Sequence, residues 1–183
     1  MKELKTTKEI YRDSIKDLQK DLGFSNAMMV PKITKIVVNA GIGKISKESD
    51  KVDEVFESLK EITGQNPIKT KIKKSIAGFK VRENQDVGVK VTLRGRRMWD
   101  FMDRLINGAL PRVRDFQGIT LRSIDNSGNL NIGIKEHAIF PEIVAEKVRH
   151  SFGFQITVVS TAENKEDAEK LYRKLGFPLQ KEN

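Results

Sequence analysis

Two runs of alternating residues in the middle of the chain constrain the fold more than any other feature. The first covers residues 68–74 and reads Ile-Lys-Thr-Lys-Ile-Lys-Lys, and the second covers residues 87–94. Successive side chains on a β-strand point to opposite sides, so a pattern that repeats every second residue predicts a strand. We therefore expect two strands, each with one apolar side and one cationic or polar side.

The alternation also predicts which residues share a side. In the first run, Ile68, Thr70 and Ile72 are expected on one side and the lysines on the other. In the second run, the apolar residues separate from Gly88, Lys90, Thr92 and Arg94. Six residues between Lys69 and Arg82 are basic and none is acidic. A sheet with such a face is suited to a polyanion, although a solvated face is the alternative.

Composition narrows the class of partner. The 183 residues suffice for one domain with a sizeable core, so we expect a single domain over residues 1–183. The net charge of +9 and the sequence pI near 9.7 favour nucleic acid or an anionic membrane surface. No apolar run has the roughly 18 residues that a transmembrane helix needs, and the first residues do not resemble a secretory signal. Because cysteine is absent, disulfides and thiolate metal sites are excluded.

The remaining pattern predicts an α+β domain. Thr6 and Glu9 have the spacing of a capping box, which predicts a helix over residues 7–22. Further helices are expected after Ser46, Gly95 and Asn164, and further strands at residues 32–40, 119–122, 130–134 and 155–160. We expect a mixed, mostly antiparallel sheet with helices covering one face and a polar, basic opposite face. Its first strand, helix and second strand could form a β-α-β unit.

A glycine-rich turn is the strongest enzyme-like signal. Gly41-Ile42-Gly43 lies between a predicted strand and a predicted helix, where a phosphate-binding loop is found. Neither nucleotide motif is complete, because Ser46 takes the place of the third glycine and Ile45 follows Lys44. A tight turn is the simpler explanation, and a third is that the glycines let a large anion approach the backbone.

Signs of catalysis or metal binding are weak. His137 and His150 are the only histidines, and no G-x-S-x-G motif is present. The carboxylates gather on predicted helix faces rather than beside strand ends. We therefore expect no catalytic residues, no metal site and no cofactor.

The polar residues favour RNA as the partner. Lysine and arginine neutralise phosphates, which supplies affinity without selectivity. Asn39, Gln65 and Thr92 are uncharged groups suited to 2′-hydroxyls and base edges. Phe79 is the one candidate for an exposed stacking residue, so docking onto folded RNA is favoured over reading of single strands.

Six segments of this sequence resemble those of a known family. They are residues 30–43, 64–67, 74–82, 90–95, 111–116 and 139–143. In this order they are similar to the large-subunit ribosomal protein that binds 5S rRNA, the universal fifth protein of that subunit, in its bacterial form. The resemblance implies a cytoplasmic ribosomal protein that is not an enzyme, with other large-subunit proteins of the central protuberance as neighbours and no membrane partner.

The resemblance implies three contact surfaces. The expected 5S rRNA site comprises Asn39, Gly41, Gly43, Gln65, Arg82, Lys90, Thr92 and Arg94. The loop expected to reach peptidyl-site tRNA comprises Lys73, Lys74, Ser75, Gly78, Phe79 and Lys80. The surface expected to face a small-subunit head protein across an intersubunit bridge comprises Arg112, Arg114, Asp115, Phe116, Phe140 and Glu142.

Two other classes stay open from the residues alone. A nucleotide-dependent enzyme could use the turn at residues 41–44, and a basic module could bind an acidic protein. Saturable nucleotide binding would favour the first, and competition by RNA would discriminate the second from an RNA-binding protein.

Overall fold

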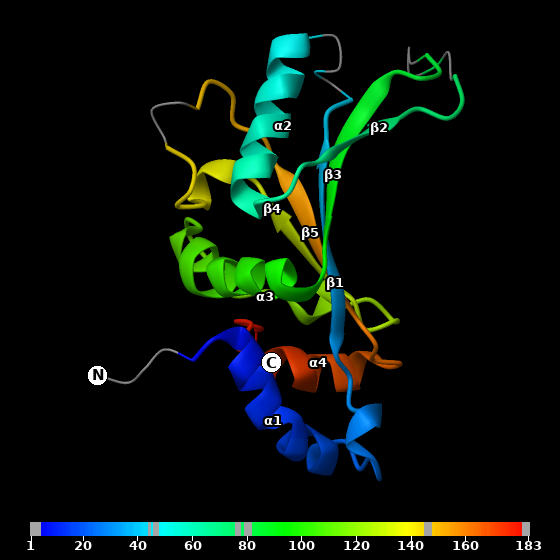
Figure 1. The fold of residues 1–183 in the computed structure, drawn as a ribbon, viewed down its shortest axis with the longest axis vertical. Helices are drawn as coiled ribbons and strands as arrows, with labels where there is room; N and C mark the ends of the chain where they lie inside the picture. The colour runs from blue at the N-terminus through cyan, green and yellow to red at the C-terminus, as the bar shows by residue number, and fades with distance from the viewer. Residues whose placement is uncertain are drawn as a thin grey trace. The chain divides into compact units, whose positions relative to one another are not determined.

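One five-stranded sheet runs through the described part of the chain. The computed structural model describes residues 5–43, 45, 48–75, 78, 82–144 and 148–180 (Figure 1). The helices within these residues are α1 (Thr7–Asp21), α2 (Ser49–Thr63), α3 (Gly95–Arg104) and α4 (Lys165–Lys174). The strands are β1 (Ile33–Gly41), β2 (Ile68–Lys71), β3 (Asp86–Leu93), β4 (Leu130–Ile134) and β5 (Phe154–Ser160).

The strand order confirms the expected α+β class. The order is β2-β3-β1-β5-β4, and neighbouring strands run antiparallel (Figure 1). Strands β1 and β2 run in the same direction, but β3 lies between them. The expected β-α-β unit is therefore present in a split form, with α2 as its crossover and an antiparallel strand inserted.

Contacts divide the chain into two compact units. Unit 1 comprises Met1–Ile36, Arg94–Ile132 and Thr157–Asn183, and unit 2 comprises Val37–Leu93 and Gly133–Ile156. Strands β1, β4 and β5 each contribute residues to both units. The expectation of a single domain over residues 1–183 stays a prediction.

Unit 1 contains the predicted capping box. The backbone N–H of Glu9 donates to Thr6 Oγ1, and the N–H of Thr6 donates to Glu9 Oε2 at 2.9 Å. Tyr172 of α4 is fully buried, and its hydroxyl lies 2.9 and 3.0 Å from the carbonyl oxygens of Gly128 and Val158. Burial raises the pKa of Tyr172, so this hydroxyl stays protonated and keeps its donor.

The strand expected at residues 119–122 is absent, which is a correction. Ile119 forms an isolated bridge with Leu179, and a 3-10 turn, Leu121–Ser123, follows. The Ile119 N–H donates to Pro178 O, and Gln180 N–H donates to Ile119 O. The backbone at Ile119 therefore pairs with a distant segment, and an isolated bridge between Ile124 and Leu130 is what connects the neighbouring residues to β4.

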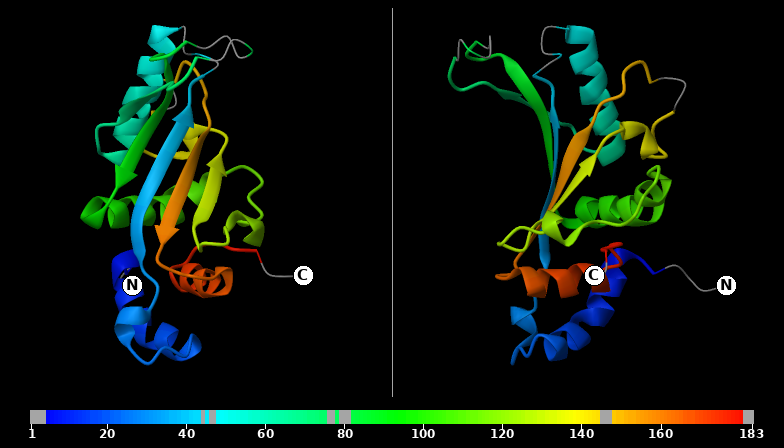
Figure 2. Two further views of the ribbon diagram at one scale, coloured as in Figure 1. Left: turned by 90° about the vertical axis from the view of Figure 1, so that its right-hand side faces the viewer. Right: turned by 180° about the vertical axis from the view of Figure 1, so that it is seen from behind.

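Unit 2 places a helix on one side of its strands. Helix α2 buries Val52, Val55, Leu59 and Ile62, and it ends at Gly64, whose φ of 66° is in the left-handed region that favours glycine. Figure 2 shows α2 against one side of β1 and β3. No described element of unit 2 covers the other side, which we call the open face.

Candidate nucleic-acid interface

The open face combines polar side chains with the backbone of two glycines. It is the side opposite the buried residues Val38, Ala40, Val89 and Val91. Strand β1 contributes Val37, Asn39 and Gly41, strand β2 contributes Ile68 and Thr70, and strand β3 contributes Gly88, Lys90 and Thr92.

Strand β3 follows the predicted alternation. Val89, Val91 and Leu93 are buried, whereas Lys90 is exposed and Thr92 is half-buried. The predicted separation of an apolar side from a polar side is therefore confirmed for this strand.

Strand β2 has the predicted period but the opposite orientation. Ile68 is 68% exposed, whereas Lys69 extends toward α2, with its Nζ 2.8 Å from Asp53 Oδ1 and 5.6 Å from the centroid of the Phe56 ring. Ile68 is paired with Lys90 in the sheet register, and directly opposite residues share a face. The pairing with β3 therefore places Ile68 on the open face. The expectation that Lys69 belongs to the exposed cationic side was wrong.

Gln65 and Thr92 are brought together. Gln65 Nε2 donates to the carbonyl oxygen of Thr92 at 3.1 Å, which links the segment after α2 to the end of β3.

Arg94 directly follows β3, belongs to unit 1 and is exposed. The N–H of Ile42 donates to Val87 O at 2.9 Å, so the turn that carries Gly41 and Gly43 is tied to the beginning of β3.

The basic loop begins where β2 ends. The N–H of Ile72 donates to Gln85 O at 2.9 Å, which closes the hairpin beside the loop. Its described residues are exposed, namely Lys73, Lys74, Ser75, Gly78 and Arg82. Phe79 and Lys80, which were expected to contact tRNA, lie outside the described residues. Within the part of the chain that is described, the side chains of Lys73, Lys74 and Arg82 form no ion pair.

The residues of the expected bridge surface lie in different environments. In unit 1, Arg112, Arg114 and Asp115 are exposed and Phe116 is half-buried. In unit 2, Glu142 is half-buried.

Phe140 requires a correction. Its side chain is 0% exposed, and its ring lies 5.8 Å from that of Phe154 in the core of unit 2. A partner cannot reach this side chain, so Phe140 supports the surface rather than contacting a partner.

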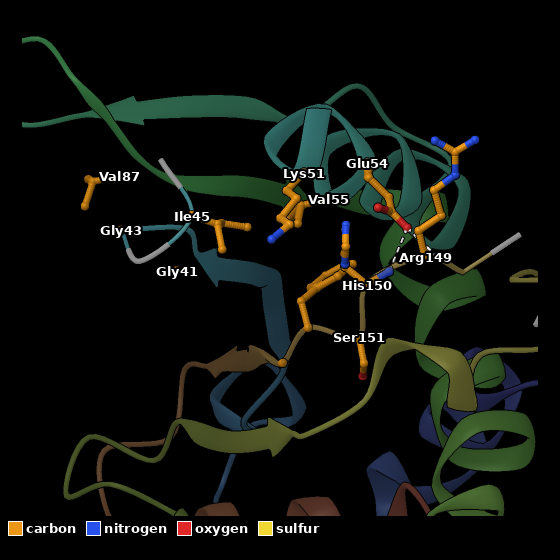
Figure 3. A pocket seen from close by; sticks show the side chains of 12 residues that line it. Gly41, Gly43, Ile45, Lys51, Glu54, Val55, Val87, Arg149, His150 and Ser151 are labelled. Carbon is orange, nitrogen blue, oxygen red and sulfur yellow. Dashed lines mark hydrogen bonds between the residues drawn. The ribbon is translucent and has the colours of Figure 1, made fainter. Parts of the chain in front are cut away.

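A cavity adjoins the glycine turn in unit 2. Its volume is about 1070 Å³, and its lining includes Gly41, Gly43 and Lys51. Figure 3 shows dashed hydrogen bonds to Glu54, whose Oε1 accepts the backbone N–H groups of Arg149 at 2.8 Å and His150 at 3.2 Å. This carboxylate therefore holds residues 149–150 against α2. The sequence contains no signal for this partner.

His137 has a structural environment. Its Nδ1 accepts the N–H of Phe152 at 3.4 Å, and its ring stacks on the Phe152 ring with centroids 4.1 Å apart. Burial lowers the pKa of His137, which favours the neutral ring. Among the residues that the structure describes, no group of three or more histidine or acidic side chains could hold a metal ion, and no helix is long and apolar enough to cross a membrane.

Comparisons with known proteins define the class as ribosomal. Residues 26–82 match the family Ribosomal protein L5, and residues 86–179 match the model for the C-terminus of the same ribosomal family. Large ribosomal subunit protein uL5 of Ureaplasma parvum serovar 3 is 49% identical over 175 residues, which cover 95% of each chain. The protein of that name from Mesoplasma florum is 51% identical over 165 residues, 90% of this chain and 92% of its own. The one from Anaeromyxobacter sp. is 49% identical over 173 residues, 94% and 96% of the two chains.

Together the two matched segments cover residues 26–82 and 86–179, well over half of the chain. The chain therefore belongs to the ribosomal protein L5 family, and the resemblance noted in the sequence is confirmed. This family is one of structural ribosomal proteins, not enzymes, so the alternative of a nucleotide-dependent enzyme at residues 41–44 is set aside.

Proposed function

We propose that this protein, a structural component of the large ribosomal subunit, binds 5S rRNA through the open face of unit 2. The observation that carries this proposal is the exposure of Lys90 beside Thr92 on the side of β3 that α2 does not cover. A lysine there neutralises phosphate, and a hydroxyl there meets ribose or base edges.

The turn after β1 supports the same proposal. Gly41 and Gly43 are exposed and carry no side chain, so an RNA backbone can approach the peptide closely. Asn39 lies two residues before Gly41 and offers an amide that both donates and accepts. The proposed site is completed by Gln65, Arg82 and Arg94.

The basic loop is proposed to contact peptidyl-site tRNA. Lys73 and Lys74 are exposed and free of ion pairs among the described residues, so their charge is available to a phosphate backbone. Ser75 and Gly78 are also exposed, and the proposal extends to Phe79 and Lys80.

A contact with a small-subunit head protein is proposed for two segments. The exposed Arg112, Arg114 and Asp115 of unit 1 offer charges of both signs, which suits a polar protein interface. Phe116 and Glu142 belong to the same proposal, from which the buried Phe140 is withdrawn.

A salt series tests the 5S rRNA proposal. With roughly 6–10 phosphate contacts, affinity for 5S rRNA should fall by about 10³–10⁵ between about 50 and 200 mM salt, by analogy with duplex DNA. An unrelated duplex RNA of equal length is the control and should bind more weakly at every salt concentration. A flat salt dependence, or equal affinity for both RNAs, would overturn the proposal.

A further inference from the structure

Thr70 extends across a glycine on the open face. Thr70 of β2 is paired with Gly88 of β3 in the sheet register. A β-carbon built on Gly88 would lie 2.7 Å from Thr70 Oγ1, closer than real β-carbons come to another heavy atom. The hydroxyl therefore lies over the empty side-chain position of Gly88.

This position lies between Thr70 and β1. The same built β-carbon would be 3.8 Å from Asn39 Oδ1 and 3.3 Å from the carbonyl oxygen of Ala40. Glycine at position 88 thus leaves a space that is bordered by the Thr70 hydroxyl on one side and the Asn39 amide, on the next strand but one, on the other. Only the sheet register brings these two residues, which are far apart in the sequence, to the same place.

The Thr70 hydroxyl and the Asn39 amide are polar groups without a role in the hydrogen bonds of the described part of the protein. Within the described ranges, neither the Thr70 hydroxyl nor the Asn39 side-chain amide forms a hydrogen bond. Thr70 is half-buried and Asn39 is exposed. A hydroxyl that is partly removed from water is normally hydrogen-bonded, so the Thr70 hydroxyl is available to a ligand, and the exposed Asn39 amide can be reached by the same ligand.

The chemistry of the pair selects the ligand group. A hydroxyl and an amide each donate and accept, and a ribose 2′-hydroxyl does the same, whereas a phosphate oxygen only accepts. Lys90, two residues after Gly88 on β3, already offers a positive charge for a phosphate group. We propose that Thr70 and Asn39 hold one ribose 2′-hydroxyl of the bound RNA, and that Gly88 is required because a side chain there would displace the Thr70 hydroxyl. This proposal rests on the proposed binding of 5S rRNA.

Interference mapping with deoxynucleotides tests the proposal. The probe is 5S rRNA carrying one 2′-deoxy substitution per molecule at random positions. We expect the wild type and Thr70→Ser to show one sensitive position that Thr70→Val and Gly88→Ala both lose. The two latter variants should bind unmodified 5S rRNA about 2- to 10-fold more weakly, the effect of one neutral hydrogen bond. The double variant should bind no more weakly than either single one, since both remove the same contact.

The controls separate a lost contact from a damaged fold. Gly133→Ala adds the same methyl group at an exposed position of β4 where a β-carbon meets nothing within 4 Å, so the sensitive position should remain. Thermal melts report whether each variant folds. If Thr70→Val does not fold, the comparison of Gly88→Ala with Gly133→Ala decides.

Each outcome has a defined meaning. If the wild type binds 5S rRNA but Thr70→Val keeps its affinity and its deoxynucleotide pattern, the 2′-hydroxyl contact is overturned while the proposed function stands. Weaker binding with an unchanged pattern also overturns the contact, because Thr70 then acts on another group. If the wild type does not prefer 5S rRNA over a control duplex, the proposed function itself fails.

Discussion

The surroundings of individual lysines decide which of them are available to RNA. Lys69 and Lys90 belong to paired strands and carry the same charge, but Lys69 forms an ion pair with Asp53 and Lys90 extends from the open face. The hydrogen bond to Asp53 raises the pKa of Lys69. An ammonium that is already paired releases fewer counterions on RNA binding.

These two lysines give a matched pair of variants. Lys90→Gln should reduce the slope of log affinity for 5S rRNA against log salt by about 0.9, the value of one phosphate contact. Lys69→Gln should leave the slope unchanged, because its partner is a carboxylate of α2. Equal slope changes in the two variants would show that the assignment of faces is wrong.

His137 predicts a pH dependence of stability. Because burial lowers its pKa from the ordinary value of 6.5, the unfolded chain binds a proton at acidic pH that the folded chain does not. This contribution to stability is therefore lost as the pH falls below about 6.5, and a nearby carboxylate, Glu54, offsets part of it.

The prediction is measured as the free energy of unfolding by urea between about pH 5 and 8. His137→Asn retains an acceptor for the Phe152 N–H but cannot titrate, so its stability should fall less on acidification than that of the wild type. Parallel pH profiles would refute a role for the buried ring.

Helices α1 and α4 differ in how much hydrogen bonds within the helix's own first turn stabilise them. Helix α1 has a capping box, in which the side chains of Thr6 and Glu9 each accept a backbone N–H. Asn164 occupies the corresponding N-cap position of α4, as the sequence predicts, but its side chain makes no capping hydrogen bond. The predicted start of each helix agrees with the structure, whereas only one of the two expected caps forms.

This difference predicts unequal effects of removing the two side chains. Thr6→Ala should lower the free energy of unfolding by about 1 kcal/mol, within a range of roughly 0.5–2 kcal/mol. Asn164→Ala, the matched control, should change it by a few tenths of a kcal/mol at most. Chemical denaturation of both variants measures the difference. If both variants lost the same free energy of unfolding, the capping hydrogen bond of Thr6 would not be the cause.

For the whole molecule, the main question is whether two RNA contacts are separable. The open face lies on β1, β2 and β3, whereas Lys73 and Lys74 follow the end of β2 in the hairpin drawn at the upper right of Figure 1. Lysines beyond the paired strands are expected to act on a different partner from those within them.

A double variant tests this separation. Lys73→Gln combined with Lys74→Gln should leave affinity for 5S rRNA unchanged and should speed the dissociation of peptidyl-site tRNA from ribosomes that carry the variant. Lys90→Gln is the control and should weaken 5S rRNA binding instead. A loss of 5S rRNA affinity in the double variant would show that the loop and the open face belong to one RNA-binding surface.

The sequence by itself determined the features that depend on neighbours along the chain. The capping box of α1, the buried stripe of α2 and the two sides of β3 follow from periods of 3.6 and 2 and from local hydrogen bonds. The family motifs also determined the class of protein, and the alternation of residues 87–94 alone places Lys90 on the polar side of β3.

Only the tertiary structure decided which way β2 faces, where residues 119–122 pair, and which carboxylate holds residues 149–150. A period of two defines two sides of a strand, but the register with β3 selects the side of Lys69 and Ile68. Likewise, the partners of Ile119 and Glu54 come from segments far along the chain. Such pairings depend on how the chain packs, which local sequence patterns do not encode.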